Sequence, residues 1–190
     1  MRITGGEFRS RPLRAPRGDR TRPTSDRVRE AMFSMLAARA PLEGARVLDL
    51  YAGTGALALE ALSRGAAHAT LVEEGREALV ALRANISDLG VTDSTLVLPI
   101  SVERASRTLA RTPADACFNL VLADPPYKLI HGGEFLRAFA PIVQSSAIAP
   151  GATVVVEHAS VDSAPVVDSL ILLESRHYGD TAVSLYRSRI

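Results

Sequence analysis

The segment Arg46-Val47-Leu48-Asp49-Leu50-Tyr51-Ala52-Gly53-Thr54-Gly55 begins as a buried β-strand and ends in a glycine-rich turn. A short apolar run that stops at turn residues is typical of a strand in a covered sheet. Apolar and small residues then continue through residues 56–63, a length that suits a short helix. Because Gly53 and Gly55 tolerate tight backbone conformations, the strand and the helix can be joined by a sharp turn. We therefore predict a strand–turn–helix unit in this part of the chain.

The same alternation continues along the chain. After the first unit we predict strands at residues 69–73, 95–98, 118–123 and 152–157, and helices at residues 76–89, 102–111 and 134–146. Strands that alternate with helices indicate a parallel sheet that is covered on both faces. Residues 169–175 and 181–186 leave no room for a helix between them, so they are predicted to form a hairpin. The predicted fold is a doubly wound α/β sheet, mostly parallel, with an antiparallel last strand.

The 190 residues carry a net charge of +1, but the charges are unevenly distributed. Residues 1–29 contain nine arginines against three acidic residues, and the remainder is acidic overall. We therefore predict a basic amino-terminal hairpin and arm, residues 1–23, on one α/β domain, residues 24–190. The first residues lack the apolar core of a secretory signal, and prolines interrupt the longest uncharged run, residues 138–156. A cytoplasmic protein without a membrane span is the expectation.

Arginine supplies all of the positive side-chain charge in the arm. Its planar guanidinium binds phosphate in a bidentate manner and stacks on bases, so this composition favours contact with nucleic acid. The alternative is a solvated and partly disordered tail. A small hairpin is expected around Gly5-Gly6, because short extended pieces flank these glycines. The arginines that we expect to contact nucleic acid are Arg9, Arg11, Arg14, Arg17, Arg20 and Arg22.

Asp124-Pro125-Pro126-Tyr127 follows the fourth predicted strand. Ligands of open α/β sheets bind outside the carboxyl ends of the strands, so this tetrapeptide is expected to line a site. The prolines stiffen the loop, which presents the Asp124 carboxylate and the Pro125 carbonyl as acceptors beside the Tyr127 ring. Two acceptors and an aromatic face suit a planar base that carries an exocyclic amine. The alternative is an aspartate cap and a turn after a core strand.

The glycine turn and Glu73 form a second candidate site. Glu73 ends the next predicted strand about 20 residues after the turn, where a carboxylate can bind both hydroxyls of a ribose. The pattern predicts an adenosine-type ligand. A small dehydrogenase remains an alternative, because Gly53-x-Gly55-x-x-Ala58 with Glu73 also matches a dinucleotide fingerprint. Asp49 argues against it, since a carboxylate beside the turn suits a cationic amino-acid group, and no separate substrate domain is evident.

Taken together, residues 49–55, Glu73 and residues 124–127 resemble class I methyltransferases, which have a Rossmann-like sheet, use S-adenosylmethionine and act on exocyclic amines. The chain resembles more closely the bacterial 16S rRNA (guanine-N2)-methyltransferases. Signatures similar to those of that family also occur in residues 2–9, 22–30 and 60–66, so that the resemblance covers nearly the whole chain. It implies that the chain methylates the 2-amino group of a guanine in small-subunit ribosomal RNA and that the arm arginines contact this RNA.

The resemblance also implies roles for single residues. Asp124 and the Pro125 carbonyl would bind the target amine, and Tyr127 would stack on the base. Relatives often carry Asp or Asn against the cofactor adenine, where this chain has Ser101 and Val102. The residues implied to lie at the S-adenosylmethionine site are Thr24, Asp49, Ala52, Gly53, Gly55, Glu73, Ser101, Val102 and Asp124. Of these, the residues of the turn would hold the methionine end and Glu73 the ribose.

Other hypotheses remain open at this point. The chain could methylate an amine of adenine or cytosine in DNA, or a glutamine side chain, or it could be an RNA-binding module without catalysis. Cytosine C5 chemistry is not expected, because the single cysteine, Cys117, precedes its strand. The four histidines are scattered, so no metal site is expected. We expect a monomer that acts on RNA in a small-subunit particle, and a mobile lid at residues 128–133 with Gly132-Gly133 as its hinge.

Overall fold

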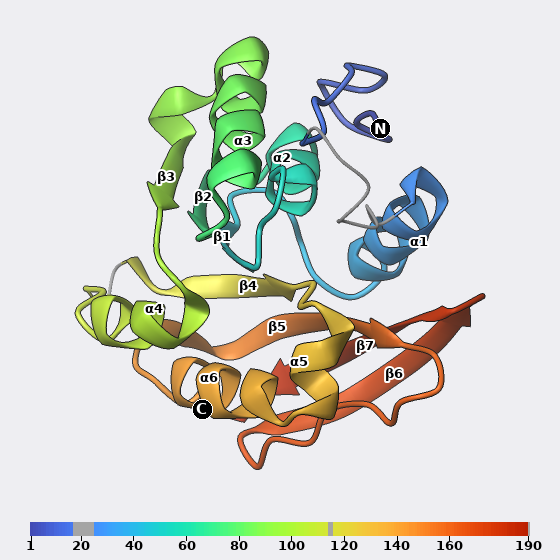
Figure 1. The fold of residues 1–190 in the computed structure, drawn as a ribbon, viewed down its shortest axis with the longest axis vertical. Coiled ribbons are helices and arrows are strands. Elements are labelled where there is room, and N and C mark those ends of the chain that lie inside the picture. Colours follow the sequence, from blue (N-terminus) through green and yellow to red (C-terminus); the bar gives the residue numbers. More distant parts are fainter. Residues whose placement is uncertain (17–24, 114–115, 190) are drawn as a thin grey trace.

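The computed structural model describes residues 1–16, 25–113 and 116–189. A seven-stranded sheet with the order β3-β2-β1-β4-β5-β7-β6 runs through the centre of the molecule (Figure 1). The strands are β1 Arg46–Leu50, β2 His68–Val72, β3 Thr95–Leu98, β4 Phe118–Ala123, β5 Ile148–Ala159, β6 Leu170–Tyr178 and β7 Thr181–Ser188. Strands β1 to β5 pair in parallel, and β7 is antiparallel to both β5 and β6. The predicted doubly wound sheet with an antiparallel last strand is confirmed.

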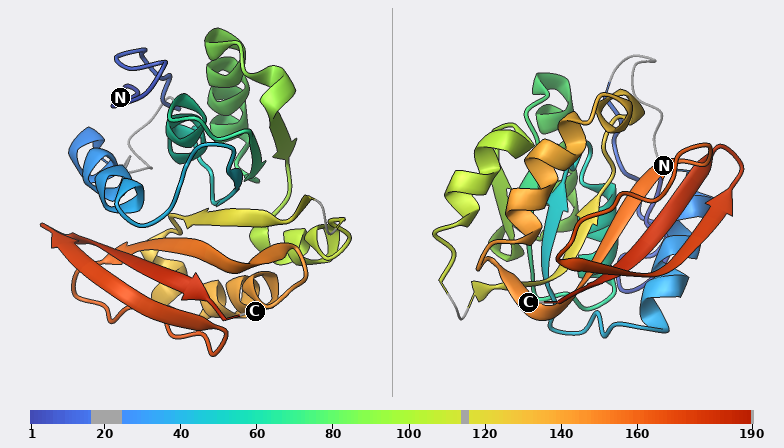
Figure 2. Two further views of the ribbon diagram at one scale, coloured as in Figure 1. Left: turned by 180° about the vertical axis from the view of Figure 1, so that it is seen from behind. Right: turned by 90° about the horizontal axis from the view of Figure 1, so that it is seen from below.

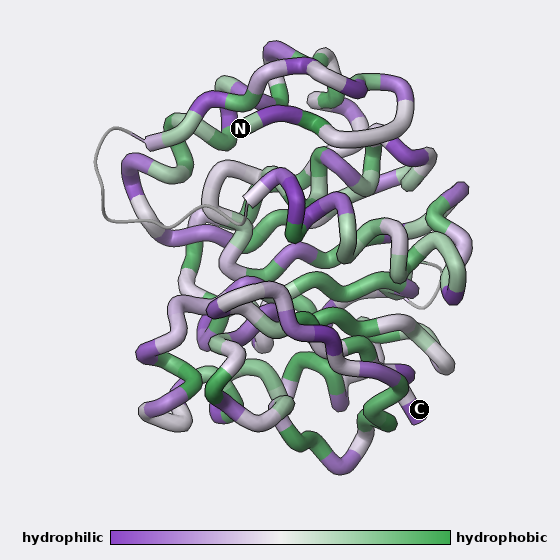
Figure 3. Tube along the Cα trace, turned by 90° about the vertical axis from the view of Figure 1, so that its right-hand side faces the viewer, coloured by the Kyte–Doolittle hydropathy of each residue, from purple (hydrophilic) through white to green (hydrophobic). Residues whose placement is uncertain are grey.

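Helices cover both faces of this sheet (Figures 1 and 2). The helices are α1 Asp26–Ala37, α2 Ala56–Ser63, α3 Arg76–Leu89, α4 Val102–Leu109, α5 Tyr127–His131 and α6 Glu134–Val143, with a short 3-10 turn at Thr92–Ser94. The first three helices lie on one face and the last three on the other. Each face buries its own apolar cluster, and the tube in Figure 3 shows the hydrophobic strands between more polar outer segments. Successive residues of a strand point to opposite clusters, as with Val47 and Leu48.

The segment after β4 differs from its prediction. Residues 128–133 were expected to form a lid loop, but Tyr127–His131 is a helix, α5. Leu129 and Ile130 pack against the apolar cluster of their face, and His131 pairs with Asp162 at 2.8 Å. A helix of five residues is marginal by itself. We therefore attribute the stability of α5 to this apolar packing and to the polar contact of His131. Among the described helices, none is long and apolar enough to cross a membrane.

The amino-terminal segment, residues 1–16, packs against the domain. Arg2 and Pro12 form an isolated antiparallel bridge, so the chain turns back around Gly5-Gly6 as predicted. Ile3 and Leu13 are buried in the same apolar cluster as residues of α1 and α2. For these residues the structure therefore shows a docked hairpin and not a solvated tail.

Candidate functional site

A cleft of about 1130 Å³ opens at the carboxyl ends of the parallel strands. This volume exceeds the roughly 300–1,000 Å³ of a typical pocket for one small ligand. Carboxylates predominate among its charged side chains, which are Glu73, Glu74, Glu77, Asp124 and Glu157 against Arg76 and Lys128. Among the residues that the structure describes, the cleft is therefore negative, and it favours a cationic ligand over an anionic one.

Glu73 holds the glycine turn at one end of the cleft. The Gly53 N–H donates to Glu73 Oε2 at 2.8 Å, and the Gly75 N–H donates to Oε1 at 2.6 Å. Through these two bonds the half-buried carboxylate links the turn to Gly75, the N-cap residue of α3. A carboxylate has about four lone-pair sites. Glu73 therefore keeps acceptor capacity for the hydroxyl groups of a ligand.

The two glycines of the turn serve different purposes. Both have a left-handed backbone, with φ of +56° at Gly53 and +80° at Gly55. A Cβ on Gly55 would lie 2.4 Å from Leu82 Cδ1, so packing beneath the turn requires glycine there. A Cβ on Gly53 would meet only the Tyr51 carbonyl oxygen, at 3.9 Å, and Gly53 lines the cleft. Gly53 is therefore the glycine whose backbone a ligand can approach.

Asp49 lies beneath the turn, where it is 1% exposed and does not line the cleft. Its Oδ2 accepts a hydrogen bond of 3.0 Å from the Ala58 N–H in the first turn of α2. Its Oδ1 has no partner among the described residues. Burial raises the pKa of Asp49 to about 8, and the charges of Asp124 and Glu73 add to the effect, which the Ala58 bond opposes. The structure thus gives Asp49 a helix-capping role beneath the turn, and its predicted contact with a cofactor stays a prediction.

The four residues after β4 reach the opposite wall of the cleft. Asp124 is half-buried, Pro125 is buried, and both line the cleft together with Tyr127. Tyr127 is the first residue of α5, and its hydroxyl forms a 3.0 Å hydrogen bond with Thr181 Oγ1 on β7. This bond restrains the ring at the wall of the cleft that Asp124 also lines. The structure therefore brings the acceptors and the aromatic face of the sequence prediction together.

The predicted adenine-side residues also line the cleft. Ser101 is the N-cap of α4, and its hydroxyl accepts from the Arg104 N–H at 3.4 Å. Val102, the first residue of that helix, is 4% exposed. Ala52 lies in the glycine turn, where its N–H donates to the Val72 carbonyl at 3.0 Å. These residues extend the wall of the cleft from the glycine turn to the start of α4.

Sequence reasoning missed several residues of the cleft wall, namely Tyr51, Tyr178, Thr181 and Glu157. Tyr51 has a φ of +60°, a left-handed conformation that is strained for an aromatic residue. Burial raises the pKa of its hydroxyl to about 12, with smaller contributions from Glu103 and Glu74. A sequence signal existed for Glu157, which ends the fifth predicted strand as Glu73 ends the second.

The predicted nucleic-acid contacts are only partly described. Arg9, Arg11 and Arg14 are exposed on the amino-terminal segment. Arg14 pairs with Asp88 at 2.8 Å, and Arg11 donates to the Asp88 carbonyl at 2.6 Å, so both hold the segment to the end of α3. The other predicted residues, Thr24, Arg17, Arg20 and Arg22, lie outside the described residues.

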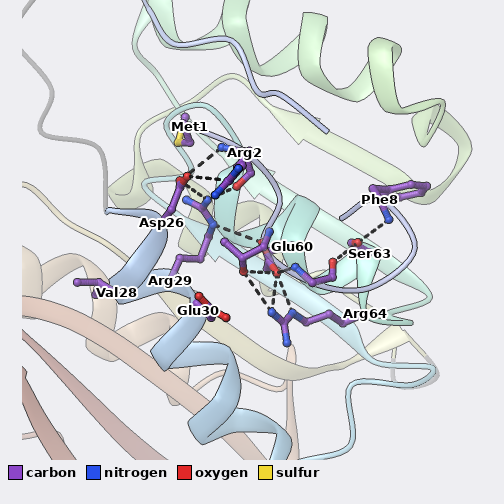
Figure 4. Close-up of polar contacts among 12 residues, drawn as sticks. Met1, Arg2, Phe8, Asp26, Val28, Arg29, Glu30, Glu60, Ser63 and Arg64 are labelled. Carbon is purple, nitrogen blue, oxygen red and sulfur yellow. Dashed lines mark hydrogen bonds and ion pairs between the residues drawn. The ribbon is translucent and has the colours of Figure 1, made fainter. Parts of the chain in front are cut away.

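A buried charged cluster anchors the amino-terminal segment to α2 (Figure 4). Glu60 accepts from the Thr4 N–H at 2.7 Å, from the Gly5 N–H at 2.8 Å and from Arg64 Nε at 2.8 Å. Arg29, which is 0% exposed, lies 3.4 Å from Glu60 and pairs also with Asp26. The helix α2, which begins at the glycine turn, therefore holds this segment together with α3.

Within residues 1–16, 25–113 and 116–189, no group of three or more His, Cys, Asp or Glu side chains could hold a metal ion. Cys117 lies apart from the cleft wall, and its Sγ is 3.0 Å from the Ser146 carbonyl oxygen.

Comparison with known proteins links this geometry to a family. The family model described as Conserved hypothetical protein 95 matches residues 1–187. YlbH of Bacillus subtilis, which is named provisionally as an rRNA methyltransferase, is 32% identical over 191 residues and the match spans both chains entirely. Ribosomal RNA small subunit methyltransferase D of Escherichia coli strain K12 is 42% identical over 130 residues, which cover 67% of this chain and 61% of that protein.

Solved structures agree with this relationship. The Escherichia coli protein yhhF, provisionally named a methyltransferase, has 34% sequence identity and a TM-score of 0.82, and the match covers 99% of this chain and 97% of that one. The methylase HI0767 of Haemophilus influenzae, also named provisionally, has 25% identity and a TM-score of 0.76, with 98% and 97% covered. The chain therefore belongs to the Conserved hypothetical protein 95 family, the family of ribosomal RNA small subunit methyltransferase D, as its sequence motifs predicted.

Proposed function

We propose that this chain transfers the methyl group of S-adenosylmethionine to the 2-amino group of a guanine in small-subunit ribosomal RNA. One observation carries the proposal: the glycine turn with Glu73 and the Asp124–Tyr127 loop meet in a single negative cleft. The relative that is named for small-subunit ribosomal RNA supports this class of substrate. The predicted alternatives, an amine of a DNA base or a glutamine side chain, are not favoured by these relatives.

The residues present fit the proposed cofactor. Its sulfonium and ammonium groups are cationic, in keeping with the five carboxylates of the cleft. Glu73 would accept from the ribose hydroxyls, the backbone of Ala52 and Gly53 would border the methionine end, and Ser101 and Val102 would contact the adenine. Asp49 and Gly55 would contribute indirectly, because they pack beneath the glycine turn and fix its backbone conformation. Thr24, which lies outside the described residues, would border the opening of the cofactor site.

A dinucleotide fits this cleft less well. Its pyrophosphate is an anion, which is usually held at the amino-terminal end of the first helix. Here the Asp49 carboxylate already accepts from the Ala58 N–H in the first turn of that helix. A pyrophosphate anion would also be repelled by the carboxylates that line the wall of the cleft. The dehydrogenase alternative is therefore disfavoured by charge.

The proposed chemistry is a direct displacement. The bound cofactor supplies a methyl group on a positively charged sulfur that departs as a neutral thioether. The guanine amine is a poor nucleophile, because its lone pair is delocalised into the ring. Hydrogen bonds from its N–H groups to the Asp124 carboxylate and the Pro125 carbonyl would localise that lone pair. Asp124 would also stabilise the positive charge that develops on nitrogen, a contribution of about 2–4 kcal/mol, before the amine loses its proton.

Tyr127 and the arginine-rich residues 1–23 would bind the RNA. The target base must leave its stack to enter the cleft, which costs a few kcal/mol in a duplex, and the Tyr127 ring would stack on it. Phosphate contacts by the arginines of residues 1–23 would supply the binding energy, with residues 24–190 as the catalytic domain. Affinity for RNA is therefore expected to fall steeply with salt. We propose that the chain acts as a monomer on a small-subunit particle.

The test uses labelled S-adenosylmethionine with undermethylated small ribosomal subunits, naked ribosomal RNA and DNA in parallel. The products are digested to nucleosides and identified by chromatography and mass. We expect label in 2-methylguanosine. Label confined to a methylated DNA base would refute the ribosomal assignment.

An Asp124→Ala variant tests the proposed mechanism. The variant should retain RNA binding, and its rate of methyl transfer should fall by roughly 100-fold or more. Glu77→Ala, which removes an exposed carboxylate of the same cleft, is the matched control and should remain active. Equal activity of the Asp124→Ala variant and the wild type would contradict the mechanism.

A further inference from the structure

We infer that the amino-terminal segment, residues 1–16, forms part of the cofactor site, and that Asn85 is the positioning residue that connects the segment to this site. The inference rests on the proposed function for the identity of the cofactor. Asn85 belongs to α3, is 1% exposed and does not line the cleft, so it acts through the glycine turn.

Both ends of the segment reach the cleft. Met1 and Pro16 line its wall together with three residues of the glycine turn, Ala52, Gly53 and Thr54. The Thr54 hydroxyl donates to the Met1 sulfur at 4.0 Å, and a thioether is a weak acceptor. A second connection between the segment and the turn passes through a buried amide.

The Asn85 amide binds the segment in one orientation. Its Oδ1 accepts from the Arg14 N–H at 2.7 Å, and its Nδ2 donates to the Arg14 carbonyl at 3.1 Å. A rotated amide would face the N–H with its own NH2 group and the carbonyl with its own oxygen. The docked Arg14 backbone therefore selects one orientation. In this orientation the second hydrogen of Nδ2 is donated to the Thr54 carbonyl, at 2.9 Å.

The turn needs this connection because glycines flank Thr54. Gly53 and Gly55 both have a positive φ, and a glycine backbone is less restricted than that of any other residue. Glu73 holds the turn from the cleft side through the Gly53 N–H, and Asn85 holds it from the segment side through the Thr54 carbonyl. These two bonds fix the Gly53 backbone before a ligand arrives, which lowers the cost of binding. Cofactor affinity therefore depends on the docked segment.

The test measures the affinity of the full chain for S-adenosylhomocysteine, the cofactor without its methyl group, by titration calorimetry in the absence of RNA. Asn85→Ala removes the amide, and we expect the dissociation constant to rise roughly 5- to 10-fold. Lost stability alone raises the apparent constant by the reciprocal of the folded fraction, less than about twofold while more than half of the chains are folded. Urea unfolding of the same variant measures this fraction.

The matched control is Asn119→Ala. Asn119 is exposed on β4, does not line the cleft, and accepts from the Arg46 N–H at 2.9 Å. This variant loses an amide that also binds a backbone N–H, but one without a connection to the glycine turn. It should keep the wild-type dissociation constant within about twofold.

A second pair of variants tests the segment itself. Arg14→Pro and Arg14→Ala both lack the arginine side chain, but only proline also lacks the N–H that donates to Asn85. We expect Arg14→Pro to bind S-adenosylhomocysteine roughly 5- to 10-fold more weakly than Arg14→Ala.

Equal affinities of the wild type and Asn85→Ala would overturn the inference and leave the proposed function intact. Equal affinities of the two Arg14 variants would do the same. A wild type that does not bind S-adenosylhomocysteine at all would refute the proposed function and the inference together.

Discussion

Replacement of Glu60 by alanine is expected to destabilise the chain more than any single surface change. Glu60 is 0% exposed and accepts from backbone groups of Thr4 and Gly5, as well as from Arg64 and Arg29. Loss of one partner of a buried ion pair usually costs about 3–5 kcal/mol, because the other charge remains buried. Arg29 would keep Asp26 at 2.8 Å. We therefore expect the lower end, about 3 kcal/mol, and a fall in Tm of about 6–12 °C.

The measurement is urea unfolding followed by circular dichroism, with thermal unfolding alongside. Glu30→Ala is the control, since Glu30 is an exposed carboxylate of α1, and it should change the free energy of unfolding by less than about 0.5 kcal/mol. The double variant Arg29→Met/Glu60→Leu removes both buried charges and should be more stable than Glu60→Ala. A loss below about 1 kcal/mol for Glu60→Ala would refute the view that this cluster anchors the amino-terminal segment.

Three further predictions concern single residues. Gly6→Ala should destabilise the fold more than Gly44→Ala in urea unfolding, because both have a positive φ but only the Gly6 Cβ would meet a backbone oxygen, that of Ser63, at 1.8 Å. The raised pKa of Asp49 means that the folded chain binds more protons than the unfolded chain between pH 3.8 and about 8. Its stability relative to Asp49→Asn, measured by urea unfolding at each pH, should therefore fall as pH rises through this window, by at most about 1.4 kcal/mol per unit. Tyr127→Phe should keep kcat/KM within about tenfold of the wild type, whereas Tyr127→Ala should lower it by roughly 10- to 100-fold through lost stacking.

Helix positions were predicted well where neighbouring residues in the sequence determine them. Serine is a favoured residue at the N-cap of a helix, and Ser25 caps α1 with a hydroxyl that accepts from the Val28 N–H at 3.2 Å. Helices α2 and α3 begin and end at the predicted residues. The place of the cleft also followed from sequence, because a parallel sheet brings the carboxyl ends of its strands to one edge.

Features that depend on distant residues were not predictable in the same way. Arg29 lies between apolar residues of α1 and is fully buried, because Glu60, 31 residues away, supplies its counter-charge. The burial of Asp49 depends on how α2 packs over the strand. The helix α5 contradicts the loop suggested by Pro126 and Gly132, because tertiary packing and not propensity stabilises it.

One side chain joins the amino-terminal segment to the glycine turn. Asn85 of α3 is 1% exposed, accepts from the Arg14 N–H at 2.7 Å, and donates through Nδ2 to the carbonyls of Arg14 at 3.1 Å and Thr54 at 2.9 Å. The concentration of arginines predicts a domain boundary near residue 23, and that boundary remains a prediction. Residues 1–16 nevertheless pack tightly on α2 and α3, because the buried Asn85 amide and the buried Glu60 carboxylate both bind them. Removal of the segment would deprive Glu60 of the Thr4 and Gly5 donors and Asn85 of both Arg14 contacts, so RNA contact and cofactor binding cannot be assigned to parts that fold independently.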